Sequence, residues 1–178
     1  MILALSGRRI DAPDTDQDRF PLRNVERVRL AIRRLLIGNG VSWLVSSAAC
    51  GADLIALSEA GRAGIGRKVV LPFDREKFRE SSVVDRPGEW AHLYDDVMSE
   101  LTPRGDVVIA KVNDNEDAFV ATCHEILDEA AAIGKELWQE VGAVVVWDGI
   151  VRETPDYTSD FRAQARARGM ETFEISTL

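Results

Sequence analysis

The stretch WLVSSAACGADLIALSEAGRA, residues 43–63, decides the fold class of this chain. It opens with a short apolar run at 43–47, passes through a few small residues, and continues from 52 to 63 with helical periodicity until Gly64 and Gly66 end the pattern. A short apolar strand followed by a helical segment is typical of a βα unit. Because almost no chain separates the two, we expect the helix to begin directly at the carboxyl end of the strand.

The same pattern of strand followed by helix recurs along the chain. Further strands are predicted at 2–6, 67–73, 105–110, 142–147 and 171–175, and further helices at 24–38, 116–133 and 158–168. The strands are continuously apolar, as in Ala143-Val144-Val145-Val146, which is typical of a parallel sheet with helices on both faces. We therefore predict one α/β domain over residues 1–178, with a Rossmann-like, doubly wound, mainly parallel sheet.

Residues 75–101 interrupt this alternation and are predicted to form a lid-like helical insertion, with helical segments at 76–80 and 89–101. Long connections inside compact domains usually carry function or are disordered. Trp90 has two interpretations here. Together with a nearby arginine it could clamp a nucleobase by stacking, or its ring could be buried against the sheet to anchor the second helical segment.

Composition argues against several classes of protein. The chain has 178 residues, of which 46% are hydrophobic, and this suffices for one sizeable core. Its net charge of -8 disfavours nonspecific binding of nucleic acid, and no stretch approaches the ~20 apolar residues of a membrane span. We therefore expect a cytoplasmic protein without membrane contact. No metal site is predicted, because Cys50 and Cys123 lack metal-ligand spacing and the adjacent Cys123 and His124 diverge on a helix.

The motifs of several enzyme classes are missing from the sequence. Neither the GxGxxG fingerprint of dinucleotide-binding folds nor the GxxxxGKS or GxxxxGKT phosphate loop occurs. His92 and His124 do not stand near a serine or cysteine in a nucleophile arrangement, which disfavours a Ser-His-Asp hydrolase. No cofactor is predicted, and no catalytic residue is assigned.

The turn between the strand at 43–47 and its helix is the strongest candidate for a ligand site. Small residues let a ligand approach the backbone, and the first amides of a helix lack internal partners and attract anions. A phosphate bound at this turn is one interpretation. The other is a tight turn in which Asp53 caps the helix. The candidate residues are Ser46, Ser47, Ala48, Ala49, Gly51, Ala52 and Asp53.

Two other strand ends are predicted to lie at the same edge of the sheet, where ligands of open parallel sheets bind. These candidates are Ser6, Gly7 and Arg8 after the first strand, and Asp148 and Gly149 after the fifth. Arg8 or Arg9 could hold a phosphate through its guanidinium, or could lie in solvent. Thr158, at the start of the last helix, is a further candidate. One interpretation is that Thr158 or Ser159 caps that helix. The other is that the free amides at the start of the helix contact a second phosphate or a ribose hydroxyl.

Three stretches carry a resemblance to a known family. They are the opening strand with Ser6-Gly7-Arg8, the segment Cys50-Gly51-Ala52-Asp53-Leu54-Ile55-Ala56-Leu57, and the strand Val70-Leu71-Pro72-Phe73. Together they resemble the SLOG superfamily, which unites DprA/Smf proteins, Lonely-Guy (LOG) enzymes and YspA-like proteins. The Gly-Ala-Asp is similar to the YspA-type motif Gly-Ala-Arg-Gly-Ala-Asp, with Ala48-Ala49-Cys50 in place of Gly-Ala-Arg. The resemblance covers residues 1–150 as a pattern of elements. It implies a Rossmann-like fold with a site for nucleotides or nucleotide-derived signals.

The leading hypothesis is binding or sensing of a nucleotide or nucleotide-derived small molecule. The alternative is an N-glycosidase or phosphoribohydrolase acting on nucleoside monophosphates or NAD-like substrates, for which Asp53, Glu59, Asp148 and Asp160 supply carboxylates. The Pro-Gly-Gly-x-Gly-Thr-x-x-Glu motif of LOG enzymes does not follow residues 142–147, which weakens this alternative. A DNA-handling role is disfavoured by the net charge of -8. A homodimer is expected by analogy with similar folds.

Overall fold

The computed structural model describes residues 1–111, 117–153 and 155–178. The strands are β1 (Ile2–Gly7), β2 (Trp43–Ser46), β3 (Gly66–Leu71), β4 (Val107–Ile109), β5 (Val141–Trp147) and β6 (Glu171–Ser176). Among the described residues they form one six-stranded sheet in the order β4-β3-β2-β1-β5-β6, and every neighbouring pair is parallel. The predicted α/β class, with a Rossmann-like parallel sheet, is confirmed.

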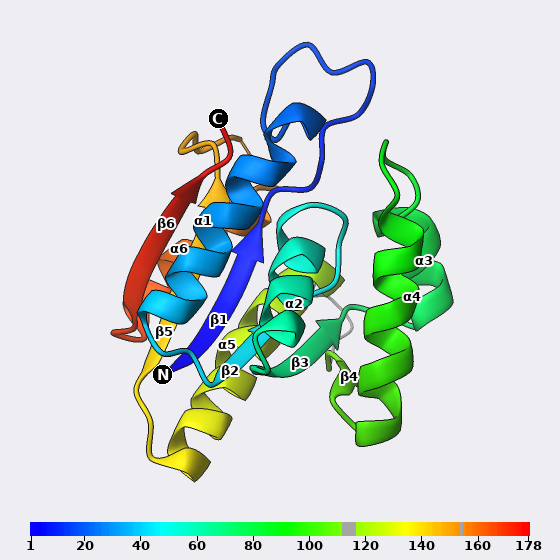
Figure 1. The fold of residues 1–178 in the computed structure, drawn as a ribbon. Helices are drawn as coiled ribbons and strands as arrows, with labels where there is room; N and C mark the ends of the chain where they lie inside the picture. Colours follow the sequence, from blue (N-terminus) through cyan, green and yellow to red (C-terminus); the bar gives the residue numbers. More distant parts are fainter. Residues whose placement is uncertain (112–116, 154) are drawn as a thin grey trace.

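Helices cover both faces of this sheet. They are α1 (Val25–Gly38), α2 (Ala52–Arg62), α3 (Arg75–Ser82), α4 (Trp90–Leu101), α5 (Ala118–Leu137) and α6 (Tyr157–Ala167), with short 3-10 helices η1 (Leu22–Asn24) and η2 (Thr102–Arg104). Buried residues of α1, α2 and α4 share one hydrophobic core, and those of α5 and α6 share a second. Figure 1 shows α1 and α2 in front of the sheet and α5 behind it. No helix in the described ranges is long and apolar enough to cross a membrane.

The continuously apolar strands serve these two cores at once. Leu3 and Leu5 of β1 lie in the core with α1 and α2, whereas Ile2 and Ala4 lie in the core with α5 and α6. Successive side chains of a strand point to opposite faces, so a strand covered on both sides needs apolar residues at every position. The sequence pattern therefore has a direct physical cause in the layer arrangement.

The strand order reverses between β1 and β5. The chain adds β2, β3 and β4 outward on one side of β1, then returns through α5 and adds β5 and β6 on the other side. The connections that leave β1 and β5 lead to helices on opposite faces, and a crevice forms between them at the carboxyl ends of the strands. This crevice sets the place of the candidate site.

Helix α5 is longer than the sequence pattern indicates. The predicted start at 116 lies outside the described residues, and the predicted end at 133 is wrong because the helix continues through Gly134 to Leu137. A Cβ on Gly134 would lie 2.3 Å from the Val141 side chain. The glycine is there for close packing against β5 and not as a helix stop, a distinction that a single sequence does not show.

The insertion at 75–101 forms α3 and α4, and its second helix belongs to the core. Trp90 is 6% exposed, lies in the core shared with α1 and α2, and its Nε1 donates to the carbonyl of Pro87 at 2.9 Å. Of the two interpretations of Trp90, anchoring of the helix is confirmed. The part of the insertion that lies near the crevice is α3 and the segment after it.

Candidate ligand-binding site

A cavity of about 580 Å³ opens at the carboxyl edge of the sheet, beside the point where the strand order reverses. Its walls come from the end of β1 and the loop that follows, the turn before α2, helix α3 and the segment after it, α5, and the start of α6. Helices from both faces of the sheet contribute. The size and the position are those of a small-molecule site in an open parallel sheet.

About half of the candidate residues line this cavity. Those that do are Ser6, Gly7, Arg8, Ser47, Ala49, Asp53 and Thr158. Those that lie outside its lining are Ser46, Ala48, Gly51, Ala52, Asp148 and Gly149. The side chains of Ser46, Ala48 and Ala52 are fully buried in the protein. The turn before α2 therefore contributes only some of its small residues to the surface that a ligand can reach.

Three amides of this turn are bonded within the chain itself. The bonds are Ala49 N to Asp53 Oδ2 at 3.3 Å, Cys50 N to Ser82 O at 3.0 Å, and Ala52 N to Arg8 O at 3.2 Å. The sequence predicts free amides that bind a phosphate here, and in the structure these three amides already have acceptors. A phosphate cannot take three donors that already have acceptors without breaking bonds to the β1 loop and to α3.

Close backbone packing requires a glycine at position 51. Its φ of +100° is in the region that side-chain-bearing residues rarely adopt, and a Cβ there would lie 2.8 Å from the Arg8 carbonyl oxygen and 2.9 Å from the Ile10 amide nitrogen. Gly7 is equally constrained, since its Cβ would lie 2.3 Å from the Cβ of Ala52. These two glycines let the loop after β1 cross the start of α2 in contact, with Arg9 and Gly51 forming an antiparallel bridge.

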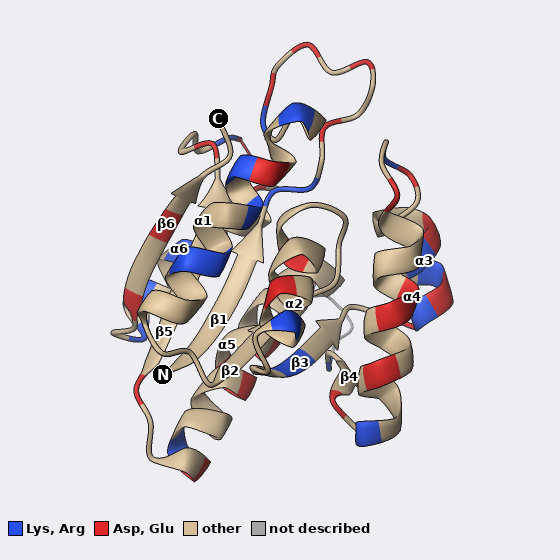
Figure 2. Cartoon of the chain, viewed as in Figure 1, with Lys and Arg blue, Asp and Glu red and all other residues tan. Residues whose placement is uncertain are grey.

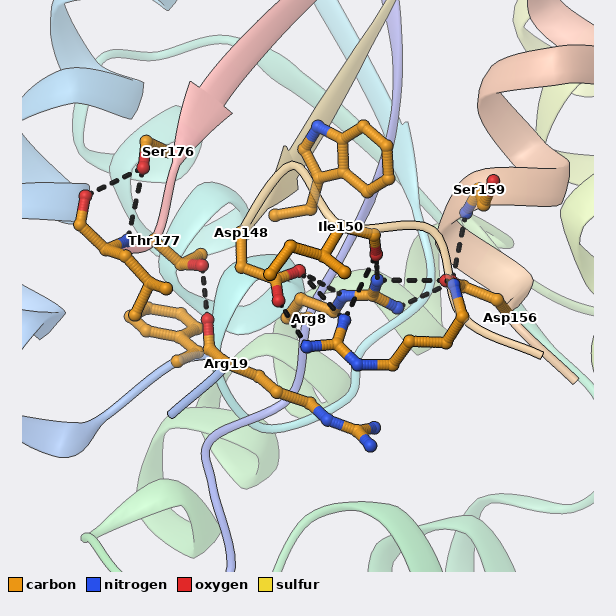
Figure 3. Close-up of polar contacts among 12 residues, drawn as sticks. Arg8, Arg19, Asp148, Ile150, Asp156, Ser159, Ser176 and Thr177 are labelled. Carbon is orange, nitrogen blue, oxygen red and sulfur yellow. Dashed lines mark hydrogen bonds and ion pairs between the residues drawn. The ribbon is translucent and has the colours of Figure 1, made fainter. Parts of the chain in front are cut away.

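Arg8 lies at the centre of an ion-pair network between β1 and the loop after β5, which Figure 3 shows in detail. Its Nε donates to Asp148 Oδ1 at 3.1 Å, its Nη1 to Asp156 Oδ1 at 2.6 Å and its Nη2 to the Ile150 carbonyl at 2.9 Å. Arg152 forms a second pair with Asp148. Burial acts to raise the pKa of Asp148, but its pairs with Arg152 and Arg8 bring the pKa below its usual value. Arg8, which the sequence offers as a phosphate fork, lines the cavity, and carboxylates of the chain occupy its guanidinium in this structure.

Asp53 is the buried acidic side chain of the cavity wall. Its Oδ2 accepts the Ala49 amide, and its Oδ1 has no hydrogen-bond partner among the described residues. Burial raises the pKa of Asp53 to about 7, against the opposing effects of the Ala49 and Gly7 amides and the charge of Arg9. The alternative in which Asp53 caps α2 is wrong, because the N-cap is Gly51 and the carboxylate bonds backward to Ala49.

Arginines outnumber acidic residues in the cavity lining, with four arginines against two aspartates. Arg9 pairs with Asp85, and Arg86 lies 3.4 Å from the other oxygen of the same carboxylate, so two guanidinium groups share one negative charge. Arg19 has no ion-pair partner among the described residues. Figure 2 shows basic residues directly after β1 and acidic residues farther along this loop. The cavity lining thus holds more arginines than acidic residues, within a chain whose net charge is -8.

Aromatic rings form another part of the wall. Phe78 comes from α3, Phe119 from α5 and Tyr157 from α6, and the ring centroids of Phe119 and Tyr157 are 5.3 Å apart. Thr122 and Cys123 of α5 lie beside them. Sequence reasoning missed these residues, although positions 119, 122, 123 and 126 share one face of the helix. Polar Thr122 in an otherwise apolar helix face is the signal that could have found this wall.

The start of α6 differs from the prediction. Asp156 is the N-cap and accepts the Ser159 amide at 3.2 Å, so neither Thr158 nor Ser159 caps the helix. Thr158 is 4% exposed and lines the cavity. Among the described residues, no group of three or more His, Cys, Asp or Glu side chains is arranged to hold a metal ion. The polar side chains of the cavity include guanidiniums, hydroxyls and the carboxyls of Asp11 and Asp53, of which only Asp53 is buried.

Comparisons with known proteins find little similarity. No family model matches the chain, and no curated protein matches it. Among solved structures, DNA processing protein A (DprA) from Streptococcus pneumoniae matches with 15% sequence identity and a TM-score of 0.33. The match covers 96% of this chain and 57% of that one, so this chain spans little more than half of its length. The match is distant, and the Rossmann-like assignment rests on the sheet topology. The resemblance to the SLOG superfamily stays a prediction.

Proposed function

We propose that this chain binds a nucleotide or nucleotide-derived small molecule in the cavity at the carboxyl edge of the sheet. One observation carries the proposal: a cavity of about 580 Å³ at the reversal of strand order combines aromatic rings with an excess of arginines. Aromatic rings suit a base, and guanidinium groups suit a phosphate, for which they offer paired donors. The two features together favour a ligand that carries both groups.

The arginines are the proposed phosphate site, in place of the amides near Gly51. Arg86 and Arg9 share the carboxylate of Asp85. One of the two can therefore bind a phosphate while the other stays paired with Asp85. Phe119 and Tyr157, which are partly exposed, then offer ring surfaces to the base, and the buried Phe78 supports this wall. The hydroxyl-bearing residues Ser47 and Thr158 also line the cavity and suit hydrogen bonding to a ribose.

Replacement of Arg86 tests the phosphate contact. Arg86→Gln is expected to weaken binding of adenosine 5′-monophosphate about ten-fold, because a hydrogen bond to a charged group contributes about 1.5 kcal/mol. Binding of adenosine, which lacks the phosphate, is expected to change little. Isothermal titration calorimetry with both compounds measures the difference. The substitution should leave folding intact, since Arg86 pairs only with its neighbour Asp85.

The matched control for this experiment is Arg104→Gln, which removes an exposed arginine outside the cavity. Its affinity for both compounds should equal that of the unmodified chain. If none of the nucleotides and cyclic nucleotides in a panel binds, the proposed function is wrong. Equal losses for adenosine and its monophosphate would place the phosphate elsewhere.

A second candidate function, hydrolysis of an N-glycosidic bond, has one specific observation in its favour. Of the four carboxylates proposed for this role, Asp53 lines the cavity. Asp148 is bound to two arginines, and Glu59 is paired with Arg29 and Arg62. A carboxyl with a pKa of about 7 is suited to protonate a leaving base. Chromatography after incubation with nucleoside monophosphates would detect the free base, and unchanged substrate at high protein concentration would exclude this activity.

A further inference from the structure

Asp53 has a geometry that is unusual for a carboxylate. It is 6% exposed, lines the cavity, accepts one backbone amide through Oδ2, and keeps Oδ1 without a partner among the described residues. No ion pair with a described lysine or arginine reaches it. An ionised carboxylate that is buried with one oxygen unpaired is costly, whereas the neutral acid has an O–H at that position and can donate.

Burial raises the pKa of Asp53 and outweighs the amides of Ala49 and Gly7 and the Ser46 hydroxyl, which favour its charged form. Arg9, in the loop after β1, is the charged group that acts on it, but this guanidinium is paired with Asp85. From α5, burial raises the pKa of the Cys123 thiol to about 12, so this neighbour stays neutral. From α6, burial likewise raises the pKa of Tyr157 to about 12. Ser46 of β2 contributes only a hydroxyl.

We propose that Asp53 binds the ligand as a neutral acid, donates a hydrogen bond to a phosphate oxygen or ring nitrogen, and takes up a proton as the ligand enters. This inference rests on the proposed function. A ligand that fills the cavity displaces water from Asp53, and its phosphate adds a second negative charge nearby. Both effects penalise the ionised carboxylate and leave the neutral form favoured. Asp53 would then select ligands that present an acceptor at this position over ligands that present a donor.

The test compares the unmodified chain with Asp53→Asn. Asparagine keeps an acceptor for the Ala49 amide and places an NH₂ donor where the neutral acid has its O–H. Calorimetry with adenosine 5′-monophosphate at pH 6, 7 and 8 gives the dissociation constants. With a pKa of about 7, the neutral fraction of Asp53 falls about ten-fold from pH 6 to pH 8, so the affinity of the unmodified chain falls by about that factor relative to the variant. The ratio cancels the titration of the ligand's own phosphate.

A second readout needs no variant. Titrations at pH 7 in two buffers of different ionisation enthalpy give the number of protons exchanged, and the unmodified chain is expected to take up protons on binding. Glu59→Gln is the matched control, because it changes a buried carboxyl on the same helix outside the cavity lining and should keep the pH dependence. Its folding is checked by urea denaturation, since Glu59 pairs with Arg29 and Arg62.

The outcomes separate this inference from the proposed function. Parallel pH profiles of the unmodified chain and Asp53→Asn, with binding intact, overturn the role of Asp53 and leave the function standing. Affinity that rises with pH relative to Asp53→Asn, or proton release in excess of that of the variant, shows that the ionised carboxylate accepts a donor from the ligand and also overturns it. Absence of nucleotide binding at every pH overturns both. If Asp53→Asn does not fold, proton uptake by the unmodified chain decides the question.

Discussion

Replacing Gly51 with alanine is expected to lower the free energy of unfolding by about 2–6 kcal/mol. Two costs add. A non-glycine residue at a φ of +100° is strained by about 1–3 kcal/mol, and the new Cβ would press on the backbone of Arg8 and Ile10 at 2.8–2.9 Å, which overpacks the site by a similar amount. The neighbours are main-chain atoms, which cannot rotate away as a side chain would. Urea denaturation followed by circular dichroism measures the loss.

Gly38→Ala is the matched control for this substitution. Gly38 is the last residue of α1, its φ is not positive, and nothing lies within 4 Å of the added Cβ. Alanine should therefore be neutral or stabilising by about 0.5–1 kcal/mol. If Gly51→Ala were as stable as Gly38→Ala, the close crossing of the β1 loop over α2 would not exist in the protein.

Replacing Arg8 with alanine is expected to lower the free energy of unfolding by about 3–5 kcal/mol, because it strands buried carboxylates. The side chains of Asp148 and Asp156 are 0% and 4% exposed, and Arg8 is the cation that contacts both. Arg152 still pairs with Asp148, so the larger part of the loss falls on Asp156 and on helix α6, which it caps. Thermal and urea denaturation measure the effect.

The pH dependence of stability gives an independent check on this network. Burial opposes ionisation of Asp156, but its bonds with Arg8 and the backbone lower its pKa below the usual value. The stabilisation that this lowered pKa provides is present above about pH 4 and is lost as the pH falls through the folded-state value. The unmodified chain should therefore lose more stability between pH 5 and pH 3 than Arg8→Ala does.

Arg23→Ala, which breaks an exposed pair with Asp18, is the control for Arg8→Ala. It should lower the free energy of unfolding by no more than about 1 kcal/mol.

The fold class could be predicted from the sequence because it depends on local, repetitive patterns. Apolar runs such as Ala143-Val144-Val145-Val146 identify strands that are covered on both faces, and glycines at the end of helical periods mark the ends of α1, α2 and α6. Gly134 is the exception, since it meets Val141 across the fold and does not end its helix. A pattern in one chain reports what each segment prefers, and here the preferences and the fold agree.

The order of the strands and the partners of each polar group depend on tertiary structure. Arg8 and Asp148 both stand at predicted strand ends, and the sequence places them at one edge, but only the reversal of strand order between β1 and β5 makes them an ion pair. The sequence predicts free amides near Gly51, yet the loop after β1 supplies the acceptor for the Ala52 amide and α3 supplies the acceptor for the Cys50 amide. The wall from α5 comes from a helix more than sixty residues away along the chain from Asp53, on the other face of the sheet. Sequence patterns report contacts within a few residues, whereas these contacts join distant segments. The local pattern therefore determined the scaffold, and the packing of distant segments decided the site.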